Sequence, residues 1–281
     1  MHTDPVILTL VQWKGGVGKS TLSVHLAAHL DAVLVDLEPW GGATVWWGGR
    51  HAAELWQRPG PAPVLQALAR GTVPRPRRGT AGRPALVPSH EGLLALNDGS
   101  SDAATWAWDT HGRPTLLVTT PEGPRPLAEA LREALPRWAT AWDRDVVVDT
   151  PAGFGPLADG AAAAADVVAC PVTLDQWAVP ALRRFMNAYR PRVRAGLIIP
   201  NRVRPRRTDN TWAELLTDDS VIEAPFELGP PVAESEVLHT APRPLGQRSQ
   251  RSAAHEAALA DIAAVAERAR ALAEQSRALA S

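Results

Sequence analysis

Short apolar runs alternate with amphipathic stretches along most of the chain. Residues 5–12 and 32–39 are apolar and rich in β-branched side chains, and a Gly-rich turn followed by a helical stretch separates them. Strand, turn, helix and strand in this order form a βαβ unit, which favours parallel strands covered by helices. Further apolar runs at 145–153, 166–172 and 195–201 continue the pattern. The sequence therefore predicts an α/β fold that is doubly wound, with a mostly parallel sheet and helices on both faces.

The segments between these runs predict helices and one long surface stretch. Residues 126–142 and 177–189 have amphipathic helical patterns. Residues 252–279 predict a C-terminal helix with one apolar face, made by Leu259, Ile262, Val265, Ala269 and Leu272. Residues 58–84 are dense in Pro, Gly and Arg, which indicates a surface segment, either a long connection or a short helix over 63–70 between loops.

Three weaker strand candidates lie at 85–89, 93–97 and 115–120, and we expect two of them to join the sheet. No linker is long enough to separate domains, so a single domain over 1–281 is the economical prediction.

Composition excludes several classes of protein. Apolar residues make up 45% of the chain, enough for a core, and the net charge is −1. The single cysteine, Cys170, excludes an internal disulfide, a cysteine-based zinc site and an iron–sulfur cluster held by this chain alone. No apolar run approaches the roughly 20 residues of a membrane span, and no basic segment precedes the first apolar run. We therefore expect a soluble cytoplasmic protein.

The lysines are unusual, because the chain has only two, Lys14 and Lys19, among 29 basic residues. Chance clustering is the alternative to a chemical reason. The glycines around them, at 15, 16 and 18, lie between a predicted strand and helix, where backbone N–H groups and the helix N-terminus favour phosphate. Lys19 then reaches the β- and γ-phosphates, the Ser20 hydroxyl can bind Mg²⁺, and Thr21 is placed near the α-phosphate.

The strict P-loop pattern requires Gly six residues before Lys19, and Trp13 stands there instead. The segment KGGVGKS resembles the deviant Walker A motif of the ParA/MinD family of P-loop NTPases. The resemblance implies ATP and Mg²⁺ as cofactors. It implies that Lys14 reaches across a dimer interface to the partner's nucleotide, while Lys19 serves its own. The implied nucleotide-binding residues are Lys14, Gly15, Gly16, Val17, Gly18, Lys19, Ser20 and Thr21.

Two further segments resemble the family's switch regions. Residues 33–44 are similar to switch I, and residues 146–155 are similar to the Walker B and switch II segment. The resemblance implies a metal site of Ser20, Asp36 and Asp149, with Asp149 acting through water. It also implies a catalytic set of Lys14, Lys19, Asp36 and Glu38.

This chain departs from the family's pattern at three positions. Glu38 stands where the family has the Asp that orients the attacking water, Trp40 replaces a Gln, and Ala152 replaces the second Pro of switch II. Because errors of about 1 Å in position can cost about 100-fold in rate, we expect slow hydrolysis that a partner stimulates.

Asn201 and Arg202 fall where members of the family often have an Asn-Arg pair near the adenine. The resemblance implies nucleotide binding for both residues. The alternative for Asn201 is that it caps a turn.

Arginines concentrate at 183–207, where nine occur without any acid. Such a block predicts contact with phosphate backbones, and ParA-type ATPases bind DNA without sequence preference through basic residues. A solvated face with surface salt bridges is the alternative. The predicted DNA-binding set is Arg183, Arg184, Arg190, Arg192, Arg194, Arg204, Arg206 and Arg207, with Arg243, Arg248 and Arg251 as candidates to extend it.

The resemblance implies a ParA-like DNA-partition ATPase. Its expected partners are a second copy of the chain in an ATP-dependent sandwich dimer, non-specific double-stranded DNA and a ParB-like adaptor, with no membrane. Plasmid or chromosome segregation and a nucleoid-associated location in the cytoplasm follow. The alternatives are a MinD-like positioning ATPase, an orphan regulatory ATPase and a metabolic enzyme on the same fold. Trp40, Trp46 and Trp47 follow switch I and are candidates for a partner or dimer surface.

Overall fold

The computed structural model describes most of the chain. The described residues are 4–79, 83–94, 96, 104–108, 114–153, 155–175, 178–204, 221–235, 238 and 253–280.

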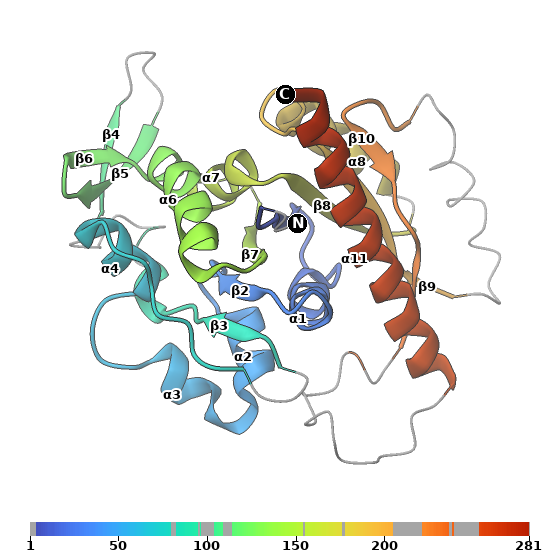
Figure 1. Ribbon diagram of the computed structural model, residues 1–281, viewed down its shortest axis with the longest axis horizontal. Helices are drawn as coiled ribbons and strands as arrows, with labels where there is room; N and C mark the ends of the chain where they lie inside the picture. The colour runs from blue at the N-terminus through green and yellow to red at the C-terminus, as the bar shows by residue number, and fades with distance from the viewer. Residues whose placement is uncertain are drawn as a thin grey trace.

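A parallel sheet of eight strands forms the centre of the molecule (Figure 1). Its path runs β10-β9-β8-β1-β7-β2-β3, and β11 also pairs with β9. The strands are β1 (Ile7–Gln12), β2 (Val33–Asp36), β3 (Ala85–Val87), β7 (Val146–Ala152), β8 (Val167–Thr173), β9 (Gly196–Val203), β10 (Phe226–Leu228) and β11 (Val232–Ala233). The first strand, β1, therefore lies in the interior of the sheet, between β8 and β7.

Helices cover both faces of this sheet, as predicted. On one face pack α6 (Leu127–Trp142), α7 (Pro156–Ala164) and α8 (Ala178–Tyr189), and on the other pack α1 (Lys19–His29) and α11 (Ala253–Ala280). Strand β7 shows why two cores form: Val146 and Val148 join the first hydrophobic cluster, whereas Val147 joins the second. Successive side chains of a strand point to opposite faces, so a continuous apolar run fits a strand that is buried on both sides.

A second sheet was not expected from the sequence. It is antiparallel and contains β4 (Ala104–Trp108), β5 (Pro114–Thr120) and β6 (Gly123–Pro126). Residues 115–120 lie in this sheet, and part of 93–97 lies in the 3-10 turn η2 (Glu91–Leu93), so the expectation that two of the three weak candidates join the central sheet is wrong. Only the 85–89 candidate does so. Leu116 and Val118 of β5 are buried in the first cluster, packed against one helical layer instead of between two.

Short helices connect β2 to β3. They are α2 (Gly42–Gly48), the 3-10 turn η1 (Gly49–His51), α3 (Ala52–Trp56) and α4 (Pro63–Arg70). Of the two alternatives for 58–84, the structure contains the short helix: α4 has Pro63 in its first turn and ends at Arg70, followed by Gly71 with a left-handed φ of 62°. The C-terminal helix α11 spans Ala253–Ala280, and Ile262, Val265 and Ala269 on it are buried. Among the described residues, none of the helices combines the length and hydropathy needed to cross a membrane.

Candidate nucleotide-binding site

The Gly-rich loop lies at the carboxyl end of β1, where the structure turns directly into α1. This is the edge at which ligands bind in doubly wound sheets. Gly16 and Gly18 have left-handed φ angles of 77° and 91°, which glycine adopts without strain. A Cβ on Gly18 would lie 2.5 Å from the Asn201 side-chain nitrogen, whereas a Cβ on Gly15 or Gly16 would meet no atom within 4 Å. The loop is therefore packed tightly at Gly18 and is open at Gly15 and Gly16.

Lys19 is the first residue of α1 and is only 8% exposed. Its ammonium group acts electrostatically on the buried Asp149, whose pKa it lowers. A buried ammonium at a helix N-terminus, next to open backbone N–H groups, is the arrangement that binds phosphate in P-loops. Ser20 follows on the same turn and also lowers the pKa of Asp149.

Two buried carboxylates lie side by side beyond the loop. Asp36 ends β2, Asp149 lies in β7, and the two residues are partners in the parallel register of these strands. Both are completely buried. Burial raises the pKa of Asp149 to about 6, against the lowering effects of Ser20, Lys19 and Ser23. Burial, followed by the charge of Asp149, raises the pKa of Asp36 well above its usual range.

The two carboxylates differ in their hydrogen bonds. Asp36 accepts from the backbone N–H and the hydroxyl of Thr44, both at 2.7 Å, and from the backbone N–H of Glu38 at 3.0 Å. Asp149 Oδ1 lies 3.0 Å from the Ser23 hydroxyl, but Asp149 Oδ2 is buried without a hydrogen-bond partner. A buried carboxylate oxygen without a donor, next to the Ser20 hydroxyl, fits the oxygen ligands that Mg²⁺ prefers. The described residues contain no cluster of three His, Cys, Asp or Glu side chains that could hold a metal alone.

Three polar residues that the sequence analysis did not single out support these acids. Ser23 lies one helical turn after Lys19, so its contact with Asp149 could be anticipated from the spacing. Thr44 donates its hydroxyl hydrogen bond to Asp36 within switch I. The backbone N–H of Ser89 in turn donates to the Thr44 hydroxyl at 2.8 Å. The Ser89 hydroxyl in turn donates to the Glu38 carbonyl at 2.6 Å. Ser89 follows the edge strand β3, and nothing in its local pattern marks this role.

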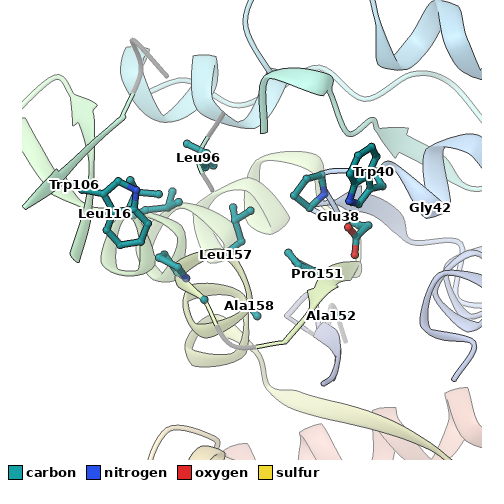
Figure 2. A pocket seen from close by; sticks show the side chains of 14 residues that line it. Glu38, Trp40, Gly42, Leu96, Trp106, Leu116, Pro151, Ala152, Leu157 and Ala158 are labelled. Carbon is teal, nitrogen blue, oxygen red and sulfur yellow. Dashed lines mark hydrogen bonds between the residues drawn. The ribbon is translucent and has the colours of Figure 1, made fainter. Parts of the chain in front are cut away.

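Glu38 faces a cavity of about 520 Å³. Figure 2 shows Glu38 and Trp40 at one end of this cavity, near Pro151 and Ala152 of switch II, with Trp106 and Leu116 of the second sheet at the other end. The Glu38 carboxylate is half-buried and accepts a 3.4 Å hydrogen bond from the backbone N–H of Trp40. Switch I, switch II and the second sheet therefore meet around one space.

Lys14 lies at the outer side of the loop and is bonded within its own chain. Its ammonium group forms an ion pair with Asp175 and lies 3.5 Å from the Thr173 hydroxyl, at the end of β8. The side chain of Lys14 is 43% exposed, whereas Lys19 is buried. The two lysines thus occupy different environments, and Asp175 is a partner that the sequence analysis did not identify.

Asn201 and Arg202 lie near the loop at the end of β9. The side-chain amide of Asn201 donates a 2.7 Å hydrogen bond to the Val17 carbonyl, so this residue positions the loop. Arg202 has a left-handed φ of 59°, and its Nε is buried without a hydrogen-bond partner. A non-glycine residue in this conformation is uncommon and often marks a functional position. Contact of either residue with adenine stays a prediction.

The arginine block of 183–207 is partly neutralised in space. Arg190, Arg192 and Arg194 pair with Glu223, Asp159 and Asp166, at 2.6, 3.2 and 3.9 Å, and Arg204 pairs with Glu234. Arg183 and Arg184 are exposed on α8. The remaining members of the predicted set, Arg206, Arg207, Arg243, Arg248 and Arg251, lie outside the described residues.

The side chains of Trp40, Trp46 and Trp47 also lie in different environments. Trp46 packs edge-on against His25 and donates to the Leu238 carbonyl, and Trp47 donates to the Pro84 carbonyl. Trp40 is 70% exposed. Of these three side chains, Trp40 is the one presented to solvent.

Known proteins resemble this chain in sequence and in fold. The carboxysome distribution maintenance protein A of Gloeobacter kilaueensis is 30% identical over 201 residues, which cover 69% of this chain and 82% of that protein. The chromosome-partitioning ATPase Soj of Thermus thermophilus is 31% identical over 195 residues, 68% of this chain and 63% of Soj. No protein-family model matches the chain.

Solved structures share the fold. A plasmid partition protein from Borrelia burgdorferi B31 bound to AMPPNP superposes with a TM-score of 0.62 at 19% identity, covering 92% of this chain and 97% of that one. An ATP complex of McdA from Cyanothece gives 0.63 at 16% identity, covering 96% of each chain. The loop, the two switch segments, the sheet order and these relatives agree: the chain belongs to the ParA/MinD family of P-loop ATPases.

Proposed function

We propose that this protein is an ATP hydrolase of the partition and positioning type, which forms an ATP-dependent homodimer and binds DNA without sequence preference. The observation that carries the proposal is the pair of lysines in one loop, with Lys19 buried beside Asp149 and Lys14 exposed at the outer side. The buried ammonium group would bind the chain's own nucleotide, and the exposed one would reach the nucleotide of a second chain.

Backbone N–H groups of residues 15–18 and the Lys19 ammonium would hold the phosphates of ATP. The Ser20 hydroxyl and Asp149 Oδ2 would hold Mg²⁺, and Asp36 would support the site through Thr44. When bound, Mg²⁺ would neutralise charge that develops on the phosphates. A nucleotide and Mg²⁺ are present together in a structure of the same fold, the cobyrinic acid a,c-diamide synthase of Mycobacterium smegmatis with ADP and magnesium, which has a TM-score of 0.59 at 21% identity.

Glu38 would orient the attacking water. Its backbone is held by Asp36 and Ser89, so the carboxylate extends from a fixed position into the cavity beside switch II. A Glu is one methylene longer than the Asp of the family pattern, and this difference supports slow basal hydrolysis. A ParB-like adaptor would then stimulate turnover.

Dimerisation would require Lys14 to exchange partners. In the single chain its ammonium group is paired with Asp175, and both side chains are partly exposed, so the pair is weak, in the range of about 0.2–1 kcal/mol. The phosphates of a partner's nucleotide carry more charge than one carboxylate and would compete for Lys14.

The relatives support a positioning or partition role, since their names refer to carboxysome distribution and to chromosome partitioning. A MinD-like membrane role has less support. The apolar face of α11 is buried against the core through Ala258, Ile262 and Val265, and Arg277 near its end pairs with Asp166. This face is therefore not available to a lipid surface.

DNA binding in three nucleotide states tests the proposal. The full-length protein is titrated with labelled random-sequence duplex in the presence of ATP, ADP or no nucleotide, each at about 50 and about 200 mM salt. We expect tight DNA binding only in the presence of ATP, and this binding should weaken steeply as the salt concentration increases. Lys19→Ala is the control, and it should bind DNA in none of the states. Absence of ATP-dependent binding by the wild-type protein, or binding to anionic vesicles instead of DNA, would overturn the proposal.

A further inference from the structure

A second basic surface lies at the β3 edge of the central sheet, in the Pro/Arg-rich segment. It is a groove of about 590 Å³, which we call the arginine groove. Five arginines line it, namely Arg58, Arg70, Arg75, Arg77 and Arg78. Its lining residues come mainly from α4 and the segment that follows it, and include Pro88 directly after β3. The elements α4 and β3 lie on the side of the molecule away from α8 and β10 (Figure 1).

Within the part of the chain that the structure describes, no acid neutralises the positive charge of the arginine groove. Between Glu54 and Glu91 the sequence contains no acid but six arginines, the five of the groove and Arg83. No Asp or Glu lines the groove, and within the described residues none of its five arginines forms an ion pair. Arg70, Arg75, Arg77 and Arg78 are exposed. Their guanidinium groups are therefore accessible to an anionic ligand.

The backbone that carries these arginines is held in place. The indole N–H groups of Trp138 and Trp142 on α6 donate to the carbonyls of Thr72 and Pro74, at 3.0 and 3.1 Å. The Arg77 backbone pairs with Leu86 of β3 through two hydrogen bonds of 2.7 and 3.0 Å. A basic surface fixed at both ends loses little conformational entropy when it binds a ligand, which favours binding.

The block at 183–207 differs in this respect. Four of its arginines are paired with acids from other segments, as described above, and it lies at the opposite edge of the sheet, around α8 and β9. An arginine that is paired with a carboxylate attracts phosphate less strongly, because the carboxylate offsets its positive charge. Among the described residues, four arginines of the block are therefore ion-paired, whereas none of the five in the arginine groove is.

We propose that the arginine groove binds the phosphate backbone of duplex DNA. This inference rests on the DNA-binding step of the proposed function and assigns that step to a surface outside 183–207. Duplex DNA carries one charge per about 1.7 Å of its axis, a density that suits several guanidinium groups in one groove. Gln66 and Thr72 also line the groove and supply neutral donors of the kind that contact phosphate oxygens. An acidic peptide offers carboxylates at lower density, so we favour DNA.

Substitution of three groove arginines tests this assignment. The groove variant carries Arg70→Gln, Arg75→Gln and Arg78→Gln, and the matched control carries Arg125→Gln, Arg132→Gln and Arg137→Gln around α6, with the same change in net charge. Both are compared with the wild-type protein in ATP, by anisotropy of a labelled random-sequence duplex across a salt series. A labelled poly-glutamate is titrated in parallel. Nucleotide affinity and the thermal unfolding midpoint confirm that each variant is folded.

We expect the groove variant to lose at least about tenfold in DNA affinity, with a slope of log K against log salt smaller by about 3, while the control stays close to wild type. Equal DNA binding by the groove variant and the control would overturn the groove assignment and leave the proposed function intact. Loss of poly-glutamate binding with unchanged DNA binding would overturn it in favour of an acidic partner. If the wild-type protein binds no DNA in ATP, the DNA step of the proposed function fails together with the groove.

Discussion

Replacing Asp149 with Asn removes a buried charge that lowers the free energy of unfolding of the chain without nucleotide. The pKa of this carboxyl rises from its ordinary value of 3.8 to about 6, first because of burial. Between these two values the unfolded chain has lost the proton and the folded chain keeps it, so stability falls as pH rises through this window. Above about pH 6 the full cost applies, about 3 kcal/mol at 1.36 kcal/mol per pKa unit. Asp149→Asn should therefore stabilise the protein at neutral pH while abolishing Mg²⁺-dependent hydrolysis.

Urea unfolding in EDTA, without nucleotide, measures this effect. About half of the 3 kcal/mol develops between about pH 5 and about pH 7.5, so the gain of the variant over wild type should be larger at the higher pH. The Asn side chain retains the acceptor for Ser23. Glu274→Gln, which removes an exposed acid on α11, is the control and should change stability little at either pH. A variant no more stable than wild type at about pH 7.5, or a gain that is the same at both pH values, would refute the reasoning.

Three further predictions concern single side chains. Lys14→Ala should abolish ATP-dependent dimerisation but keep ATP binding by the monomer, because Lys14 lies exposed at the outer side of the loop; a dimer in ATP by light scattering would contradict this. Glu38→Asp should raise the basal rate of phosphate release, by up to about 100-fold, because the carboxylate returns to the length of the family pattern; an unchanged or lower rate would count against the role of Glu38. Trp138→Ala should cost about 3–5 kcal/mol of unfolding free energy, since the side chain is fully buried, whereas Trp108→Ala, at a 75% exposed position, should cost little; equal urea midpoints for these two variants would be inconsistent with the packing.

The central sheet could be predicted because its strands are buried on both faces. A run such as 146–150 has no polar alternation, and this pattern together with the interleaved helices specifies a parallel sheet. The second sheet could not be predicted in the same way. Its strand β4 is largely exposed and β5 packs against one helical layer, so their apolar patterns are weak and match those of other elements. The helices α2 and α3 are short and carry no caps or long apolar stripe that would mark them.

The candidate site was predicted where the chemistry is local in sequence. The loop residues 14–20 are contiguous, and their glycines and lysines are informative on their own. The supporting contacts are not local: Thr44 meets Ser89 across 45 positions, and Lys14 meets Asp175 across 161. Nothing in the sequence near Ser89 or Asp175 identifies such a partner, because the contact depends on how β3 and β8 are placed around β1.

The net charge of a sequence segment also differs from the net charge of the surface that the segment forms in the fold. The nine arginines of 183–207 have no acid among them, yet Glu223 and Glu234 follow in sequence and fold back onto Arg190 and Arg204. The arginine groove shows the opposite case, since its arginines are more widely spaced in sequence and the fold gathers them on one surface. Contact with phosphate depends on the arrangement in space, which sequence spacing alone does not give.

We propose that ATP controls assembly through Lys14, and sedimentation of the chain tests this claim most directly. We predict a monomer of 30.0 kDa without nucleotide or with ADP, and a species of twice that mass with ATP and Mg²⁺. A mass that stays the same in all three conditions, whether monomer or dimer, would contradict the claim.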